Sequence, residues 1–164
     1  MQLSDGLQIA GALTASTRNI RTGEETNFTT TNLLVLSGRD LICALLAREP
    51  GVLGLTAFAL GEGIEPTAPT TLGLEDEVFR STNITAFTPL PGQGRLRIEY
   101  HLSTSEAVPA TITEAGLFGG DAAGSVLVAR VVLERPIIRV VNPAGVSDEE
   151  VRFSWLLSLK AEVR

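Results

Sequence analysis

The sequence predicts a mainly β protein, an antiparallel β-sandwich or barrel of about seven or eight strands with one packed α-helix and an N-terminal arm. Three observations support this fold class. Residues 151–163 carry apolar side chains at every second position, which is typical of a strand with one buried face. Turn signals rich in Gly, Pro and Asn recur between further short apolar runs. One segment alone, following Ser37, repeats Leu and Ile at helical spacing.

Length and composition limit the classes of function. The chain has 164 residues, which suits one domain or one domain with an arm. Its net charge of −6 and lack of basic clusters argue against nucleic acid or an anionic membrane as a partner. The single cysteine, Cys43, excludes an internal disulfide. No apolar run approaches the roughly 20 residues of a membrane span, so we expect a soluble protein made in a cytoplasm.

Residues 1–31 differ from the rest of the chain and predict a separate N-terminal arm or hairpin, with residues 32–164 as the β-rich body. Two segments of strand composition flank a turn at Gly23. A lone hairpin is marginal in water, so this one must lie on the body or on another subunit. We expect subunit contacts from its apolar side chains, Leu7, Ile9, Leu13, Ile20 and Phe28.

The first half of the body predicts one helix and two strands. Ser37 is a suitable N-cap with Asp40 three residues later, and Pro50-Gly51 ends the helix. A strand over residues 53–60 then stops at Gly61-Glu62-Gly63. The segment 64–71, with two prolines, predicts an exposed loop, and residues 72–78 predict an acidic helical turn. Residues 79–88 predict the second strand.

The second half predicts strands in hairpin succession. Leu96, Ile98, Tyr100 and Leu102 alternate with polar residues over 95–103, a half-buried pattern. Strands follow over 110–118 and 126–133. Because Pro136 interrupts the next apolar run, residues 137–141 predict an edge strand or a separate one. In the last strand Phe153 and Trp155 share the apolar face, so we predict both as core residues.

No stretch predicts a catalytic, cofactor or metal site. Gly61-x-Gly63 lacks the third Gly and the following helix of a nucleotide-binding loop, so it predicts a turn. The acidic residues 75–77 match no calcium loop and indicate a solvated turn. His101 lies on the polar face of its strand without the partners that a general base requires. We therefore expect a protein that is not an enzyme.

Glu114 lies inside an apolar strand and needs a partner. A buried carboxylate must be hydrogen-bonded or paired with a cation. Arg130, on the next predicted strand, is the candidate. The sequence predicts a structural ion pair between these two residues.

Four stretches, in order, resemble the tail-collar-fibre-like family of tailed-phage virion proteins, over roughly residues 32–160. They are 32–46 (NLL…SGRD and a Leu-rich helix), 59–80 (ALGEG…PTAP…LEDEVFR), 112–118 (ITEAGLF) and 127–130 (LVAR). In this resemblance Gly61, Gly63 and Gly116 serve turns or close backbone approach, and Glu114 orders the hairpin.

The resemblance implies a structural role without catalysis. It implies docking on a virion as a tail, collar or fibre-attachment component, with tail, collar or capsid subunits as partners. Because no fibre shaft follows residue 164, we expect either a tail-side adaptor or a protein that decorates and stabilises the capsid. A homo-oligomer is expected, and three-fold symmetry fits either role. A host-surface module for a sugar or small ligand is the rival, although aromatic residues are only 5% of the chain.

Overall fold

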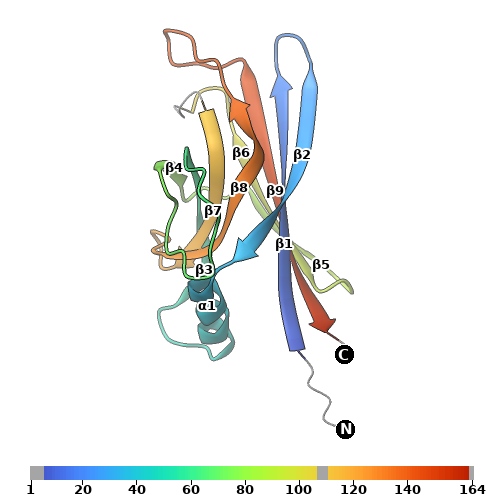
Figure 1. Ribbon diagram of the computed structural model, residues 1–164, viewed down its shortest axis with the longest axis vertical. Coiled ribbons are helices and arrows are strands. Elements are labelled where there is room, and N and C mark those ends of the chain that lie inside the picture. Colours follow the sequence, from blue (N-terminus) through green and yellow to red (C-terminus); the bar gives the residue numbers. More distant parts are fainter. Residues whose placement is uncertain (1–5, 107–110, 163–164) are drawn as a thin grey trace.

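A computed structural model describes the backbone of residues 6–106 and 111–162 and the side chains of 8–106 and 111–160 (Figure 1). The described chain forms nine strands and one helix. They are β1 (Gly6–Asn19), β2 (Glu25–Leu34), α1 (Leu36–Leu46), β3 (Leu53–Gly61), β4 (Glu77–Ser81), β5 (Ala86–Leu90), β6 (Arg95–Leu102), β7 (Thr111–Gly120), β8 (Val126–Ile138) and β9 (Glu149–Glu162).

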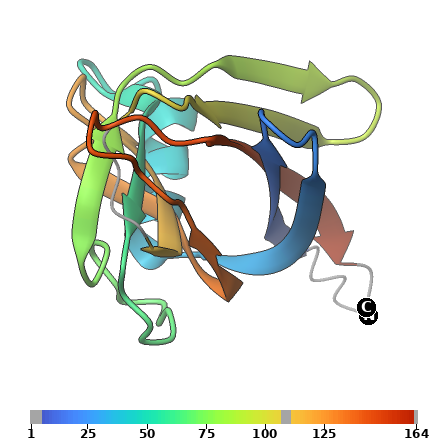
Figure 2. The same cartoon turned by 90° about the horizontal axis from the view of Figure 1, so that it is seen from above.

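All nine strands belong to one antiparallel sheet, in the order β4-β3-β7-β8-β2-β1-β9-β6-β5. Figure 2 shows the sheet curled into a half-barrel. The prediction of a mainly β fold with one helix is confirmed. A two-layer sandwich is not formed, because β2 pairs with β1 along most of its length and then with β8 at Leu33 and Leu34. This strand joins the two halves of the sheet.

The predicted N-terminal arm is instead part of the body. β1 lies between β2 and β9, and its fourteen residues all have partners in β9. Leu13 and Ala15 are each only 1% exposed and belong to the core. Part of the apolar surface of this segment is thus buried within the same chain. The physical reason is that β1 completes the curvature of the sheet, so a body beginning at Asn32 lacks a central strand.

Two strand boundaries also differ from the prediction. Residues 79–88 are divided between β4 and β5, which lie at opposite edges of the sheet and are linked by residues 82–85. β8, in contrast, continues through Pro136. The pairing of β7 with β8 skips from Glu114–Val132 to Ile112–Ile137, so Pro136 lies in a bulge. A bulge tolerates a residue without an N–H group.

Helix α1 packs across β8 and β3 and begins two residues earlier than predicted. Its N-cap is Val35, and no side chain caps it. The Ser37 hydroxyl instead donates to the carbonyl oxygen of Leu127 at 2.7 Å. A Cβ atom at Gly38 would lie 2.3 Å from the carbonyl oxygen of Val128, so glycine permits the close approach of helix and strand.

The core is built around aromatic side chains on the inner face of the half-barrel. Phe58 of β3 stacks on Tyr100 of β6 with ring centroids 4.6 Å apart, and it contacts Phe153 at 5.1 Å and Trp155 at 6.4 Å. Phe153 and Trp155 are each 1% exposed, which confirms both as core residues. Aromatic contacts therefore join the two halves of the curled sheet.

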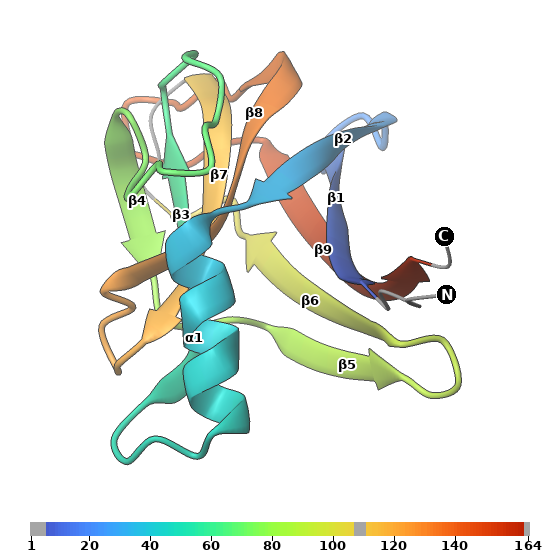
Figure 3. The ribbon, with the colours of Figure 1, turned by 60° about the horizontal axis from the view of Figure 1, so that its bottom comes forward.

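The two ends of the half-barrel are finished differently. β5 pairs with Arg95–Glu99 of β6. The last residues of β6, from Tyr100 to Leu102, extend past β5 and face β4, the strand at the other edge of the sheet. There Phe79 of β4 contacts Tyr100 with centroids 6.2 Å apart, and we call this the closed end. At the opposite end, which we call the open end, α1 and the β5–β6 hairpin lie on either side of the mouth (Figure 3).

Candidate functional site

A buried ion pair links β7 and β8. The Nε of Arg130 donates to Oε2 of Glu114 at 2.7 Å, and the two side chains are 2% and 0% exposed. This is the pair expected from the sequence. Because a buried carboxylate is costly without partners, the surroundings of Glu114 must satisfy its remaining lone pairs.

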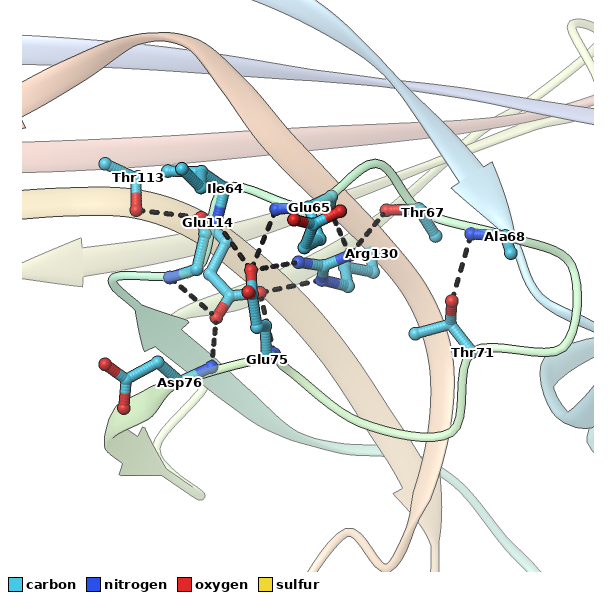
Figure 4. Close-up of polar contacts among 11 residues, drawn as sticks. Ile64, Glu65, Thr67, Ala68, Thr71, Glu75, Asp76, Thr113, Glu114 and Arg130 are labelled. Atoms are coloured by element: carbon cyan, nitrogen blue, oxygen red, sulfur yellow. Dashed lines mark hydrogen bonds and ion pairs between the residues drawn. The ribbon is translucent and has the colours of Figure 1, made fainter.

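Those lone pairs are satisfied by the loop between β3 and β4, residues 62–76, which we call the anchored loop (Figure 4). Oε1 of Glu114 accepts hydrogen bonds from the backbone N–H groups of Gly63 at 3.1 Å and Asp76 at 2.8 Å. Oε2 accepts from the N–H of Glu75 at 3.1 Å. One carboxylate therefore holds both ends of the loop.

Arg130 and Glu75 hold the first part of the same loop. Nη1 of Arg130 donates to the carbonyl oxygen of Glu65 at 2.8 Å and lies 3.3 Å from Oγ1 of Thr67. Oε2 of Glu75 accepts from the N–H groups of Ile64 and Glu65 at 2.6 and 2.8 Å. The predicted helical turn at residues 72–78 is absent, since the backbone N–H groups of Glu75 and Asp76 bond to the carboxylate of Glu114 instead.

The three glycines singled out in the sequence serve close approach rather than turns. A Cβ atom on Gly61 or Gly63 would lie 2.4 or 2.5 Å from Oε1 of Glu114. On Gly116 it would meet side-chain carbons of Phe118 and Leu74 at 2.8 and 2.9 Å. None of the three has a positive φ. The spacing Gly-x-Gly thus makes room for the carboxylate that orders the loop.

The remaining polar candidates are arranged as surface or structural groups. Nε2 of His101 lies 3.8 Å from a carboxylate oxygen of Glu150, while the Ser103 hydroxyl contacts Ser105 and Glu106. Within residues 8–106 and 111–160, no three His, Cys, Asp or Glu side chains are grouped as metal ligands. Within the anchored loop, the carboxylate of Glu75 accepts backbone hydrogen bonds.

A second polar cluster lies at the closed end. The Tyr100 hydroxyl donates to Oε1 of Glu106 at 2.7 Å, and Nη2 of Arg139 donates to the carbonyl oxygen of Ser103 at 2.8 Å. Burial raises the pKa of Tyr100, with the Glu106 carboxylate adding to the effect. Burial also lowers the pKa of the Arg139 guanidinium. Both side chains hold the segment that follows β6.

The predicted subunit contacts of residues 1–31 differ in how far they are exposed. Leu13 is 1% exposed, and Ile9 and Phe28 are partly buried against the core. Ile20, at 52% exposure, is the one whose side chain is largely open to solvent. The side chain of Leu7 lies outside the described residues. Leu13 is thus taken up by the core of its own chain and is not available for a subunit contact, whereas contacts through Ile9, Ile20 and Phe28 stay a prediction.

An apolar groove of about 630 Å³ opens at the open end. We call it the groove. One wall is α1 and the opposite wall is β5 with the turn that follows it, while β1, β6 and β9 form the floor (Figure 3). Among the residues that the structure describes, Arg95 is the only charged one that lines it. The apolar side chains on which the argument depends are Leu41, Leu45, Phe87, Leu96, Leu157 and Leu159.

Sequence reasoning missed the groove because its residues come from separate elements. Leu96 and Leu157 lie opposite each other in β6 and β9, so the alternating pattern correctly assigns both to the inner face. Alternation identifies a face but not whether another element covers it. α1 packs chiefly on β8, and this part of the face stays open.

Comparisons with family models, with curated proteins and with solved structures gave no match. In the part of the chain that the structure describes, no helix combines the length and the apolar character needed to cross a membrane.

Proposed function

We propose that this chain is a non-enzymatic structural protein of a tailed-phage virion that docks on the particle as a tail, collar or fibre-attachment component. The observation that carries the proposal is the convergence of three of the four resembling stretches. Gly63 and Glu75 come from one stretch, Glu114 and Arg130 come from two others, and all four meet in one hydrogen-bonded cluster. Together these residues hold the anchored loop rigidly at the surface.

The cluster supports a structural role because its charges are used within the chain. Glu114 accepts from three backbone N–H groups and one guanidinium. A general acid or base instead needs a proton within reach of a substrate, and this carboxylate is 0% exposed. A rigid loop together with an exposed apolar groove elsewhere on the molecule suits a protein whose task is to contact other proteins.

The size of the groove favours a second candidate, a small-ligand module. Small-molecule sites enclose about 300–1,000 Å³ and combine apolar walls with a few polar groups. The groove volume falls within that range, but Arg95 is its only charged side chain. A sugar site would need several hydrogen-bonding groups, so within this class an apolar ligand fits better.

The location of the protein in virions tests the proposal. Particles released from the source cells are purified, and antibody against the recombinant protein is used for immunoblotting and for gold labelling in the electron microscope. Label at the tail or collar is the expected result. Label over the whole head supports capsid decoration instead. Purified particles without the protein would exclude both virion roles and direct attention to the small-ligand module.

A further inference from the structure

We propose that the groove is the docking site for a second copy of this chain, which inserts its anchored loop in a head-to-tail contact. The inference deepens the proposed function, and its meaning for a particle rests on that function. The contact itself is a property of the isolated protein. Four observations lead to it: the exposed apolar groove, the exposed apolar loop, the complementary charge, and the separation of the two surfaces.

The groove leaves large apolar side chains in water. Phe87 is 47% exposed, Leu159 51% and Leu45 38%, and the three come from different sides of the same depression. Apolar area removed from water contributes about 25 cal/mol per Å². A contiguous apolar depression of this kind is typical of a site that another group covers.

The anchored loop carries the apolar side chains that fit such a site. Ile64 is 70% exposed and Leu72 is 76% exposed. Neither can move to the groove of its own chain, because Glu114 and Arg130 hold the loop against β7 and β8. A loop that is already ordered loses little conformational entropy when it docks.

The charges of the two surfaces are complementary. Arg95 forms no salt bridge with the described residues, and its Nη1 lies 3.4 Å from Oε1 of Gln93. Glu62 and Glu65 of the anchored loop are exposed and likewise form no salt bridge within the described residues. Positive and negative groups placed in this way favour one orientation of the contact.

Another exposed apolar segment fits less well. Val140 is 71% exposed, but the neighbouring carboxylate of Glu149 accepts hydrogen bonds from the N–H of Val140 and from Ser147. That carboxylate has partners already, so it would gain less from Arg95. Complementary charge therefore selects the anchored loop.

The two surfaces lie on different parts of the molecule. Figure 3 shows the loop between β3 and β4 at the upper left, whereas the β5–β6 hairpin and the end of α1 lie at the bottom. A contact between unlike surfaces is heterologous, and its repetition gives a closed ring or an open filament. A ring of three, the symmetry expected from the sequence, is one such closed product.

A complementation experiment tests the contact with full-length protein. The loop variant is Ile64→Ser with Leu72→Ser, and the groove variant is Phe87→Glu with Leu159→Glu. All four positions are substantially exposed, so both variants should fold, which circular dichroism verifies. Light scattering after size exclusion should show assembled wild-type protein at micromolar concentrations and monomers for each variant alone.

The equimolar mixture of the two variants is the decisive sample. The groove variant still has an intact loop and the loop variant an intact groove, so they should form a dimer and nothing larger. Leu46→Ser is the matched control, because Leu46 is 78% exposed on α1 but does not line the groove. This control should assemble like the wild type.

Charge reversal tests the register of the contact. Arg95→Glu and Glu65→Arg should each raise the dissociation constant about tenfold, and the double variant should regain most of that loss. Equal losses in the single and double variants would show that these two residues do not meet and would overturn the proposed orientation.

Three outcomes would overturn the docking itself. The first is a wild-type protein that stays monomeric, and the second is a mixture of folded variants that forms no dimer. In the third, the loop variant assembles normally while the groove variant does not, which would show another occupant. A monomeric protein that is found in virions contradicts this inference alone, whereas an assembling protein absent from virions contradicts only the proposed function.

Discussion

The closed and open ends of the half-barrel are built from the same strands but treat their inner faces differently. At the closed end Phe79 and Tyr100 meet across the gap between the sheet edges. At the open end the same sheet exposes Phe87 and Leu159 in a groove. The difference shows that an inner-face residue of this sheet is buried only where another element lies opposite it. It also identifies the open end as the place where a bound partner would lower the free energy by removing apolar side chains from water.

Deleting residues 1–31 should have the largest effect, because β1 contributes to both the core and the groove. Its Leu13 lies opposite Trp155 in the core, and its Ile9 lines the groove. We expect the truncated chain to be unfolded, with loss of the strand signal in circular dichroism. A folded truncation would restore the hypothesis of a separate arm.

Glu114→Ala should strongly lower the free energy of unfolding. The change leaves the guanidinium of Arg130 buried without its carboxylate and removes the acceptor of three N–H groups, at a cost of about 5 kcal/mol. Chemical denaturation measures the loss. Glu62→Ala is the matched control, since Glu62 is exposed, and a change of about 0.5 kcal/mol or less is expected there.

The double variant Glu114→Leu/Arg130→Met distinguishes two contributions to the free energy of unfolding, that of the ion pair and that of anchoring the loop. Removing both charges should recover part of the stability, because no charge is left buried alone. The N–H groups of Gly63, Glu75 and Asp76 would still lack their acceptor, so recovery should be incomplete. A double variant with the free energy of unfolding of the wild type would mean that anchoring the loop contributes nothing to stability.

Two residues on one face of β9 compare the buried core with the groove directly. Trp155→Ala should lower the free energy of unfolding by about 3–5 kcal/mol, since the side chain is 1% exposed. Leu159→Ala, at a side chain that is 51% exposed, should lower it by about 1 kcal/mol or less. Similar losses at moderate dilution, where no assembly occurs, would show that the groove is filled within the monomer.

Alkaline pH should weaken the closed end. Burial raises the pKa of Tyr100 above its ordinary value near 10, so the folded state keeps this proton where the unfolded state loses it. The contribution of the protonated Tyr100 phenol to the free energy of unfolding is fully present below about pH 10. It falls as the pH rises further, by up to about 1.4 kcal/mol per pH unit.

Absorbance can follow this ionisation without ambiguity, because Tyr100 is the only tyrosine. Phenolate absorbance should appear together with unfolding rather than before it. Tyr100→Phe should remove this part of the pH dependence. A phenol that ionises near pH 10 in folded protein would contradict the buried position of the hydroxyl.

Much of the fold could be predicted from local patterns, and the errors have one physical origin. Alternation over residues 95–103 and 151–163 identifies β6 and β9 and their inner faces, and Trp155 lies there as predicted. Alternation does not reveal which strands are neighbours. Residues 1–31 therefore predicted an arm, although β1 lies at the centre of the sheet.

The candidate site shows the same contrast. The pair of Glu114 and Arg130 was predictable because a charge inside an apolar strand demands a partner nearby. That Glu114 also holds the loop through Gly63 and Asp76 depends on contacts between distant segments. The groove was not predictable, because it arises from the absence of a covering element over residues that have ordinary core patterns.

The pairing of β1 with β9 has a consequence for synthesis of the chain. The first strand made must wait for the last, because β9 supplies the partners of all fourteen residues of β1. During translation that edge of β1 is open while most of the sheet is already outside the ribosome. Such distant pairing slows folding, and an unpaired strand edge is prone to join other chains. Newly made chains should therefore depend on chaperones until β9 has emerged.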